Sequence, residues 1–197
     1  RTEFEMDPGT VDPREAVLAL DRIVPPEIGV LSGSGMTSAF CSMLMTRRRG
    51  LVQGGHFFGC IGQMLPAAMG AVVATGKPAM LIDGDASVMM HLAEFETAVR
   101  YNMPLLVIVM NNEALGAEYY KLDAHKMETR GSQITTPDLG KVAVSFGGRG
   151  RMATTIDELT AAAKEFVAKP GPMMVDLRIS KSVPSVPYRR LHYGRDE

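Results

Sequence analysis

Two apolar runs of the chain end abruptly in small and oxygen-bearing residues, and this feature constrains the fold more than any other. Residues 79–83 lead into Gly84 and Asp85, and residues 105–110 lead into a pair of asparagines that ends at Asn112. Apolar runs of this length, bounded by turn residues, are typical of strands buried on both faces of a parallel sheet. The residues between them are enough for one crossover helix. We therefore expect Asp85 and Asn112 side by side at the carboxyl edge of the sheet.

The remaining segments predict the same architecture, because short apolar strands alternate with helical periodicity along the whole chain. The fold class expected is α/β, a doubly wound and mainly parallel sheet with helices on both faces. Further strands are expected at 28–31, 151–152 and 172–177, and helices at 10–23, 65–74, 92–101, 138–146 and 156–168. We expect residues 1–10 to be a linker or an expression remnant, residues 11–182 the folded domain, and residues 183–197 a C-terminal tail or lid that contributes nothing to the core.

Composition excludes several classes of function. A formal net charge of −1 argues against a nucleic-acid partner, and the apolar segments are too short and too interrupted to span a membrane. Cys41 and Cys60 have neither metal-ligand spacing nor the pattern of a disulfide framework, so we expect reduced thiols in a cytoplasmic protein. The basic run 47–49 predicts a solvated loop.

The two strand ends carry hard oxygen donors. A carboxylate, an amide oxygen and exposed backbone groups suit Mg²⁺ that holds a phosphate. Gly-Asp and Asn-Asn also favour ordinary turns, and either pair alone is explained equally well as a turn. Their occurrence at adjacent strand ends, each after an apolar strand, favours a metal–phosphate site.

Two glycine-rich stretches could contribute to the same site. Residues 32–35, Ser-Gly-Ser-Gly, follow a strand and precede a helix start, which is either an anion-binding turn or an ordinary tight turn. Residues 53–62 contain four glycines around His56 and two phenylalanines, so the backbone can approach a ligand closely between apolar rings. His56 is either a catalytic-site residue or a hydrogen-bonded structural one.

The motif Gly84-Asp85-Ala86, followed at this spacing by Asn111-Asn112, resembles the thiamine diphosphate motif. With Leu-Pro-Ala-Ala-Met-Gly-Ala at 65–71, the chain is similar to acetolactate synthase and its relatives from about Val11 to Pro184. The similar part corresponds to the C-terminal, diphosphate-binding domain of that family. The motif pair is highly specific for the cofactor and weakly specific for the substrate.

The resemblance implies a set of cofactor contacts. Asp85, the Asn112 side chain and the backbone carbonyl of Ala114 would ligate Mg²⁺. Gly35, Met36 and Thr37 fall where the family often has Gly-Gln-His, of which only the glycine is kept. The other residues that match diphosphate-contacting positions are Gly84, Ala86, Ser87, Leu115, Gly116 and Ala117.

The resemblance also places the ring end of the cofactor. Ile61 matches the bulky apolar residue that bends the cofactor, and the carbonyl of Gly59 would accept a hydrogen bond from the aminopyrimidine. This bend brings the exocyclic nitrogen close to the carbon whose proton it removes. His56, Phe57, Tyr119 and Tyr120 flank these positions and are weaker candidates for the pocket wall.

The family activates its cofactor with a glutamate on a separate pyrimidine-binding domain, which this sequence does not contain. We therefore expect that domain in the same longer chain or in a separate subunit, within a homodimer or homotetramer. The function implied is decarboxylation or ligation of small 2-oxo acids, with this chain alone inactive. Two alternatives remain open: a subunit of a split 2-oxo acid decarboxylase, and a non-catalytic assembly module of the same fold.

Overall fold

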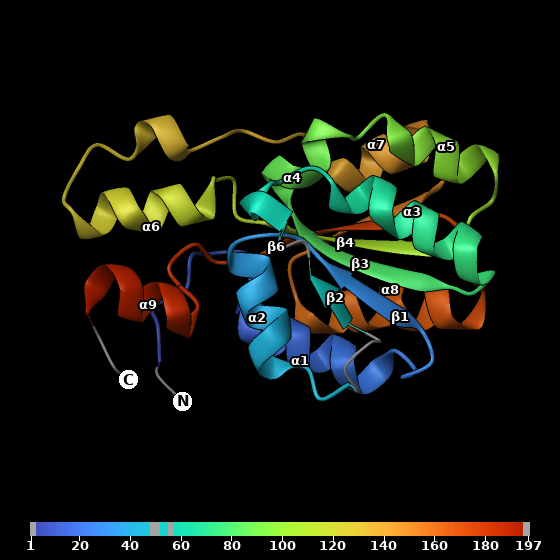
Figure 1. The fold of residues 1–197 in the computed structure, drawn as a ribbon, viewed down its shortest axis with the longest axis horizontal. Coiled ribbons are helices and arrows are strands. Elements are labelled where there is room, and N and C mark those ends of the chain that lie inside the picture. Colours follow the sequence, from blue (N-terminus) through green and yellow to red (C-terminus); the bar gives the residue numbers. More distant parts are fainter. Residues whose placement is uncertain (1–2, 48–51, 55–56, 195–197) are drawn as a thin grey trace.

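The computed structural model describes residues 3–47, 52–54 and 57–194. Its centre is a six-stranded sheet in the order β2-β1-β3-β4-β6-β5, in which every described pairing is parallel (Figure 1). The expectation of a mainly parallel α/β sheet is confirmed. The strands are β1 (Gly29–Ser32), β2 (Val52–Gly54), β3 (Ala79–Gly84), β4 (Leu105–Asn111), β5 (Arg149–Ala153) and β6 (Met173–Arg178).

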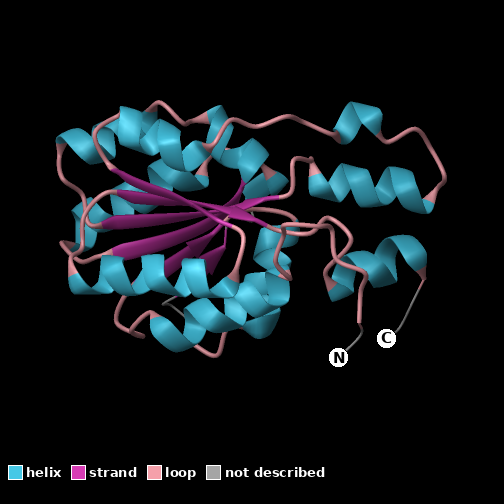
Figure 2. Ribbon diagram, turned by 180° about the vertical axis from the view of Figure 1, so that it is seen from behind, coloured by secondary structure: helices cyan, strands magenta, loops and turns pink. Residues whose placement is uncertain are grey.

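Helices cover both faces of the sheet. In Figure 1, α1, α2 and α8 lie below it and α3, α4, α5 and α7 above it, and Figure 2 shows the same two layers from behind. Helices α6 and α9 lie to one side, beyond the carboxyl ends of the strands. The helices are α1 (Pro13–Ile23), α2 (Met36–Leu44), α3 (Met64–Thr75), α4 (Asp85–Met90), α5 (Glu94–Arg100), α6 (Gly116–Ala124), α7 (Leu139–Ser145), α8 (Ile156–Ala168) and α9 (Val186–Tyr193), with short 3₁₀ turns η1 (Phe57–Gly59) and η2 (Arg130–Ser132).

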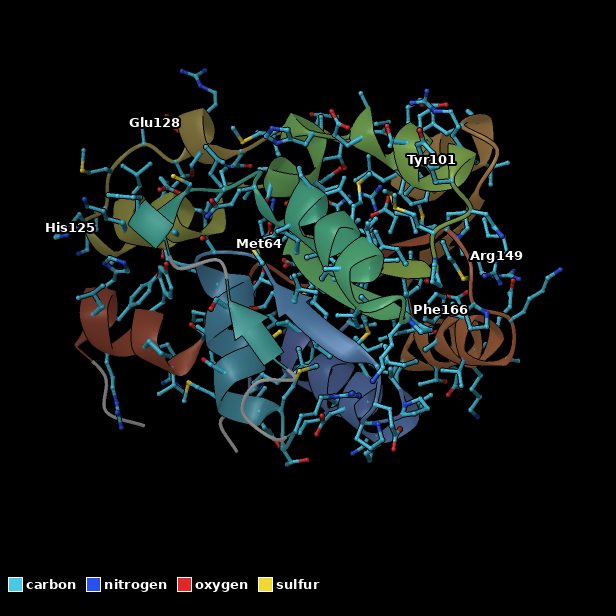
Figure 3. All side chains as sticks on the ribbon, turned by 45° about the vertical axis from the view of Figure 1, so that its right-hand side comes forward. Met64, Tyr101, His125, Glu128, Arg149 and Phe166 are labelled. Atoms are coloured by element: carbon cyan, nitrogen blue, oxygen red, sulfur yellow. The ribbon has the colours of Figure 1, made fainter. Side chains whose placement is uncertain are left out.

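Successive strand residues alternate between two hydrophobic cores. On β3, Met80 and Ile82 pack against α1, α2 and α8 on one face of the sheet, whereas Leu81 packs against α3 and α5 on the other. Phe166 of α8 is fully buried against the sheet, while His125 and Glu128 are exposed at the tip of the α6–η2 region (Figure 3). Because both faces of the central strands are buried, long stretches of them, such as 79–82 of β3 and 105–110 of β4, are continuously apolar instead of alternating.

Local sequence signals explain several element boundaries. Asp12 caps α1 through a hydrogen bond from the Arg14 backbone N–H, and Pro13 follows it directly. Thr155 and Glu158 form the predicted capping box at the start of α8. The predicted helix 92–101 is shorter in the structure, where α5 runs from Glu94 to Arg100. A separate short helix, α4, directly follows β3. Neither β2 nor α9 was predicted.

The segment from residue 183 onward was expected to contribute nothing to the core, and this expectation is wrong at its beginning. Val183 is fully buried, Arg189 is 5% exposed, and residues 186–193 form α9, which packs against α6 and α2. Pro187 stands in the first turn of α9, where its fixed φ suits a helix start. Prolines therefore mark the start of a docked helix here.

The segment before α1 is attached to the same region. The carboxylate of Asp7 accepts hydrogen bonds from the backbone N–H groups of Lys181 and Ser182 and from the hydroxyl of Ser180. The ring of Phe4 lies against the guanidinium groups of Arg14 and Arg189, 4.9 and 5.2 Å from the ring centroid. The pKa of Asp7 lies below its usual value, because hydrogen bonds from Ser180, Lys181 and Ser182 favour the charged form more than burial disfavours it.

The expected solvated loop at 47–49 is wrong for its first residue; residues 48 and 49 lie outside the described part of the chain. The Arg47 side chain is only 2% exposed and forms an ion pair with Asp21 at 3.0 Å. It also donates to the backbone carbonyls of Val24, Pro25 and Ile28, between α1 and β1. A guanidinium has enough donors to satisfy a whole turn, and a basic run does not reveal this in the sequence.

Of the helices in the described ranges, none is both long and apolar enough to cross a membrane.

Substituting Arg47 tests how much its buried contacts with Asp21 and the turn before β1 stabilise the fold. We expect Arg47→Met to lower the free energy of unfolding by about 3 kcal/mol, because it leaves the Asp21 carboxylate and three carbonyls without their buried partner. Urea denaturation would measure the change. Arg100→Met is the matched control, since the Arg100–Glu96 pair is exposed and should contribute little. Equal effects of the two substitutions would contradict the assignment.

Candidate functional site

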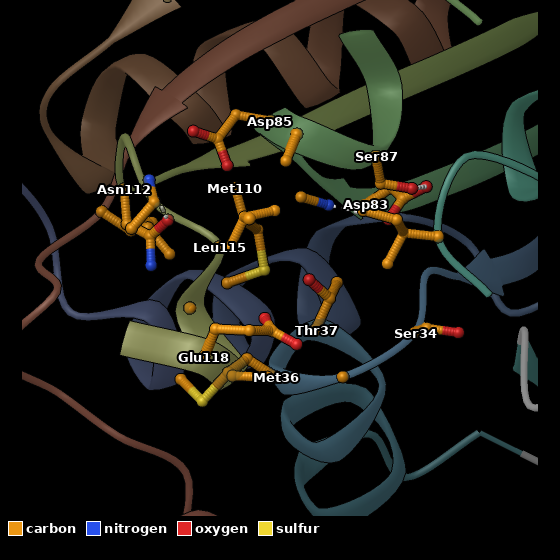
Figure 4. Close-up of a pocket in the computed structure, with 18 of the residues that line it drawn as sticks. Ser34, Met36, Thr37, Asp83, Asp85, Ser87, Met110, Asn112, Leu115 and Glu118 are labelled. Carbon is orange, nitrogen blue, oxygen red and sulfur yellow. Dashed lines mark hydrogen bonds between the residues drawn. The ribbon is translucent and has the colours of Figure 1, made fainter. Parts of the chain in front are cut away.

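A cavity of about 340 Å³ opens at the carboxyl ends of β1, β3 and β4. In open parallel sheets this edge is where ligands bind. Figure 4 shows side chains from several elements converging on the cavity. The described residues that line it are Ser34, Gly35, Met36, Thr37, Phe40, Gly59, Ile61, Asp83, Gly84, Asp85, Ala86, Ser87, Met110, Asn112, Ala114, Leu115, Gly116, Ala117, Glu118, Ile179 and Ser180.

Asp85 and Asn112 come together because β3 and β4 are paired in register. Gly84 lies opposite Met110, so both chains leave the sheet at nearly the same level. Both side chains line the cavity (Figure 4). The structure therefore brings together the two residues that the sequence placed at neighbouring strand ends.

The Asp85 carboxylate is a buried charge without a complete set of partners. The residue is 1% exposed, and its Oδ2 atom has no hydrogen-bond partner among the described residues. Burial raises the pKa of Asp85 to about 7, although nearby backbone N–H groups, including that of Glu113, favour the charged form. An orphaned carboxylate oxygen that faces a cavity is what a cation-binding site requires in the absence of its cation.

The turn after β4 presents further oxygens. The Asn112 side-chain oxygen accepts the Ala114 backbone N–H at 3.2 Å and keeps a second lone pair. A short antiparallel bridge pairs Ala114 with Gln133. Its two hydrogen bonds run from the Leu115 N–H to the Ser132 carbonyl and from the Ile134 N–H to the Glu113 carbonyl. Neither bond uses the Ala114 carbonyl.

Asn111, the first asparagine of the pair, has a different environment. It is 1% exposed, and its amide nitrogen donates to Thr136 and Asp176, both at 2.8 Å. Its side-chain oxygen accepts the Glu113 N–H, and Glu113 adopts a positive φ of 55°. Asn111 thus fixes the strained turn that presents Asn112 to the cavity.

Three helices begin at the cavity without a side-chain cap. They are α2 after Gly35, α4 after Gly84 and α6 after Leu115. The first N–H groups of a helix need acceptors, and together with the helix dipole they attract anions. Helices α3, α5 and α9 also lack such caps, so it is the convergence of three N-termini on one cavity that indicates an anion site.

The acidic side chains of the lining favour a cation. Asp83, Asp85 and Glu118 line the cavity, and no Lys, Arg or His does so among its described lining residues. A bound diphosphate would add further negative charge at short range, which a divalent cation offsets. The described residues contain no group of three His, Cys, Asp or Glu that could hold a metal alone. Asp85, amide and carbonyl oxygens, and phosphate oxygens form a donor set that fits Mg²⁺.

Asp83 also lines the cavity, and it is not among the site residues predicted from the sequence. A side chain at Gly33 would place its Cβ 1.7 Å from the Asp83 carboxylate, so only glycine fits there. Asp83 is 1% exposed, and burial raises its pKa to about 6 against hydrogen bonds from Ser87 and the Gly84 N–H. Part of the expected anion-binding turn therefore accommodates a carboxylate of the protein itself.

The candidate residues for the ring end are only partly placed. Gly59, with a φ of 66°, and Ile61, 37% exposed, both line the cavity. His56 and the side chain of Phe57 lie outside the described residues. Tyr119 and Tyr120 line a different cavity between α6 and α9, where the Tyr120 hydroxyl donates to the Lys181 carbonyl at 2.5 Å. Their proposed place in the wall of the main cavity is wrong.

Several lining residues were missed by sequence reasoning. Ile179 and Ser180 follow β6, whose end lies beside that of β4, so the rule applied to β3 and β4 would have found them. Glu118 and Phe40 lie inside helices, and Met110 is the apolar residue just before the asparagine pair. Only the three-dimensional packing reveals these three.

A parallel α/β sheet with three helix N-termini and a partly unpaired carboxylate at one cavity is compatible with a diphosphate-binding domain. Residues 33–177 match the family described as thiamine pyrophosphate enzyme, C-terminal TPP binding domain. Thiamine pyrophosphate is the cofactor called thiamine diphosphate above. The chain belongs to this family.

Curated relatives are acetolactate synthases. The mitochondrial catalytic subunit of Saccharomyces cerevisiae is 30% identical over 98% of this chain, and the large subunit of Haemophilus influenzae is 28% identical over 91%. The chain spans only 29% and 32% of those proteins. A solved thiamine diphosphate-dependent 4-hydroxybenzoylformate decarboxylase of Rhodococcus jostii RHA1 has the same fold, with a TM-score of 0.78 and 23% identity over 91% of this chain and 34% of its own.

The orphaned carboxylate predicts a gain in stability when it is neutralised. At pH 8 without divalent cations, we expect Asp85→Asn to raise the free energy of unfolding by about 1–2 kcal/mol, because a buried charge is replaced by a neutral amide. Asp157→Asn, an exposed carboxylate in the first turn of α8, should give no gain. Urea titrations of the three proteins would measure the difference, and a large loss for Asp85→Asn would contradict the site.

Proposed function

We propose that this chain is the diphosphate- and Mg²⁺-binding part of a thiamine diphosphate-dependent enzyme that decarboxylates or ligates 2-oxo acids. The observation that carries the proposal is the buried, incompletely paired Asp85 carboxylate in a cavity that three uncapped helix N-termini share. The family shown by residues 33–177 supports the cofactor. The reaction rests on the names of the relatives, acetolactate synthases and a 4-hydroxybenzoylformate decarboxylase.

The proposed roles at the diphosphate end are those that the resemblance implies, and the geometry of the cavity is consistent with them. Asp85 and the Asn112 side-chain oxygen would ligate Mg²⁺, and the Ala114 carbonyl would complete the protein ligands. The backbone N–H groups at the starts of α2, α4 and α6 would donate to the phosphates. The residues assigned to phosphate contacts are Gly35, Thr37, Gly84, Ala86, Ser87, Leu115, Gly116 and Ala117. The N–H groups of Gly84 and Leu115 already donate to Asp83 Oδ1 and to the Ser132 carbonyl, so these two residues would line the site without donating. Burial of Asp85 strengthens its attraction for the cation, because little water screens the charge.

At the other end, the protein would orient the rings. Bound thiamine diphosphate supplies an electron-accepting ring that lets the bond between the carboxylate and carbonyl carbons of a 2-oxo acid break. Ile61 lies at the cavity with an exposed apolar side chain that can wedge between two rings, and the Gly59 carbonyl would hold the aminopyrimidine. Apolar lining from Met36, Phe40 and Met110 would keep water away from the reacting atoms.

Exposed apolar side chains around residues 58–62 support the presence of a partner domain. The Phe58 ring is fully exposed, Ile61 is 37% and Met90 58% exposed, and Gly62 brings the loop against Met90. Contiguous exposed apolar side chains at the mouth of a site mark a surface that another domain covers. We propose that a pyrimidine-binding domain, in the same longer chain or in a second subunit of a homodimer or homotetramer, covers it.

The test uses the full-length protein with its pyrimidine-binding partner. We expect it to retain thiamine diphosphate through gel filtration in Mg²⁺ and to release it when a chelator removes the metal. Asp85→Ala should lose both the bound cofactor and the consumption of pyruvate and related 2-oxo acids, whereas Asp157→Ala should lose neither. Retained cofactor in Asp85→Ala would refute the metal site.

The same protein separates the proposed enzyme from an assembly module. Binding of cofactor without consumption of any 2-oxo acid would favour a module that has lost turnover. Absence of cofactor from the wild-type protein would refute the proposal as a whole.

A further inference from the structure

The segment Cys60–Gly62 connects η1 to the turn before α3 and lies outside the helices and strands. It is next to Gly59 and includes Ile61, the two residues assigned to the ring end of the cofactor. Two serine hydroxyls from different elements bind its backbone. The Ser34 hydroxyl donates to the Cys60 carbonyl at 2.8 Å, and the Gly62 N–H donates to the Ser87 hydroxyl oxygen, also at 2.8 Å.

The Ser87 hydroxyl both accepts and donates a hydrogen bond within the protein. It accepts from Gly62 and donates its own proton to Asp83 Oδ2 at 2.6 Å. A hydroxyl has one proton, so this side chain has none left to donate to a phosphate. Ser87 is 4% exposed. The sequence placed Ser87 among the diphosphate contacts, and in the structure only its backbone N–H is free of this network for that role.

Asp83 fixes the orientation of the Ser87 hydroxyl. Its Oδ1 atom accepts the Gly84 N–H at 2.8 Å, and the absence of a side chain at Gly33 leaves room for the carboxylate. Charge-assisted hydrogen bonds of this kind are stronger than neutral ones. A continuous chain of hydrogen bonds therefore runs from the end of β3 through Ser87 to the loop.

Helix α4 also supports the loop by direct packing. Gly62 has a φ of 91°, and a Cβ built there would lie 3.1 Å from the Met90 Cβ and 3.0 Å from the His91 Nδ1. Asp85 opens the same helix, and Ser87 follows it by two residues. One short element thus carries the proposed metal ligand, the hydrogen bond to the loop and the surface on which the loop rests.

We propose that Ser34 and Ser87 form a clamp on Cys60–Gly62 and are positioning residues that set the distance between the diphosphate end and the ring end of the site. The clamp itself follows from the hydrogen bonds, and its effect on the cofactor rests on the proposed function. Neither hydroxyl touches the reacting atoms. Both act through the loop that presents Gly59 and Ile61.

The first experiment needs no cofactor. Hydrogen–deuterium exchange of the full-length apoprotein should show faster exchange of the Gly62 amide in Ser87→Ala, by about tenfold, the effect expected from losing one hydrogen bond of typical strength. Ser145→Ala is the control, since its hydroxyl donates to the Lys141 carbonyl within α7 and makes no hydrogen bond to the loop. Unchanged exchange at Gly62 in Ser87→Ala would overturn the clamp.

The second experiment compares two ligands in the full-length protein with Mg²⁺, by calorimetry. Pyrophosphate occupies only the diphosphate end, and thiamine diphosphate occupies both ends. We expect Ser34→Ala and Ser87→Ala to weaken thiamine diphosphate binding about tenfold and pyrophosphate binding less than about twofold. Ser34→Thr keeps the hydroxyl and should restore the affinity for thiamine diphosphate that Ser34→Ala loses.

The outcomes separate the two hypotheses. Equal weakening of both ligands would overturn the positioning role, because the serines would then serve the phosphates. Wild-type affinities in both alanine variants would overturn it as well. If wild-type protein bound pyrophosphate and thiamine diphosphate equally, or neither, the proposed function would fail, and the exchange experiment would still decide whether the clamp exists.

Discussion

The parallel pairing of β3 with β1 on one side and β4 on the other is the constraint on which the rest of the structure depends. Parallel strands deliver their carboxyl ends to one edge, and the register Gly84 opposite Met110 brings two chain reversals to the same level. Each reversal then starts a helix whose first N–H groups point toward the shared space. The site is thus a consequence of topology, and the side chains at these three strand ends decide which ligand it accepts.

Asp85 shows how such a site differs from the core around it. Residues 79–82 of β3 are apolar and buried, which stabilises the sheet. Asp85 is as buried as those residues but retains an oxygen with no partner. A sequence selected only for stability would not leave a carboxylate in this state, so the residue is best explained by a ligand that completes its coordination.

The sequence predicted the sheet, its parallel strands and the meeting of Asp85 with Asn112, because the strands 79–83 and 105–110, apolar at all positions but Asp83, leave few alternatives. It predicted less well where polar residues have hidden partners. Arg47 reads as a solvent-exposed charge, yet it satisfies a buried turn, and residues 183–193 read as a tail, yet they begin in the core and continue into α9. Tyr119 and Tyr120 follow the second motif closely in sequence, but the direction of α6 carries them to another cavity. Periodicity and turn propensity carry no information about such partners, which are set by tertiary packing.

The serines near the strand ends illustrate the same limit at the level of a single hydroxyl. Next to glycines and a helix start, Ser34 and Ser87 both suggest anion contacts from their sequence context. In the structure both hydroxyls bind the backbone of the Cys60–Gly62 loop, and Ser87 does so with Asp83 as its acceptor. In the proposed function, the phosphates would then be left to backbone N–H groups, which any residue supplies, and Met36 and Thr37 could stand where the family often has Gln and His. Side-chain hydroxyls at this edge are needed to hold the loop in place, because the glycines that let it approach a ligand closely also leave its backbone free to move.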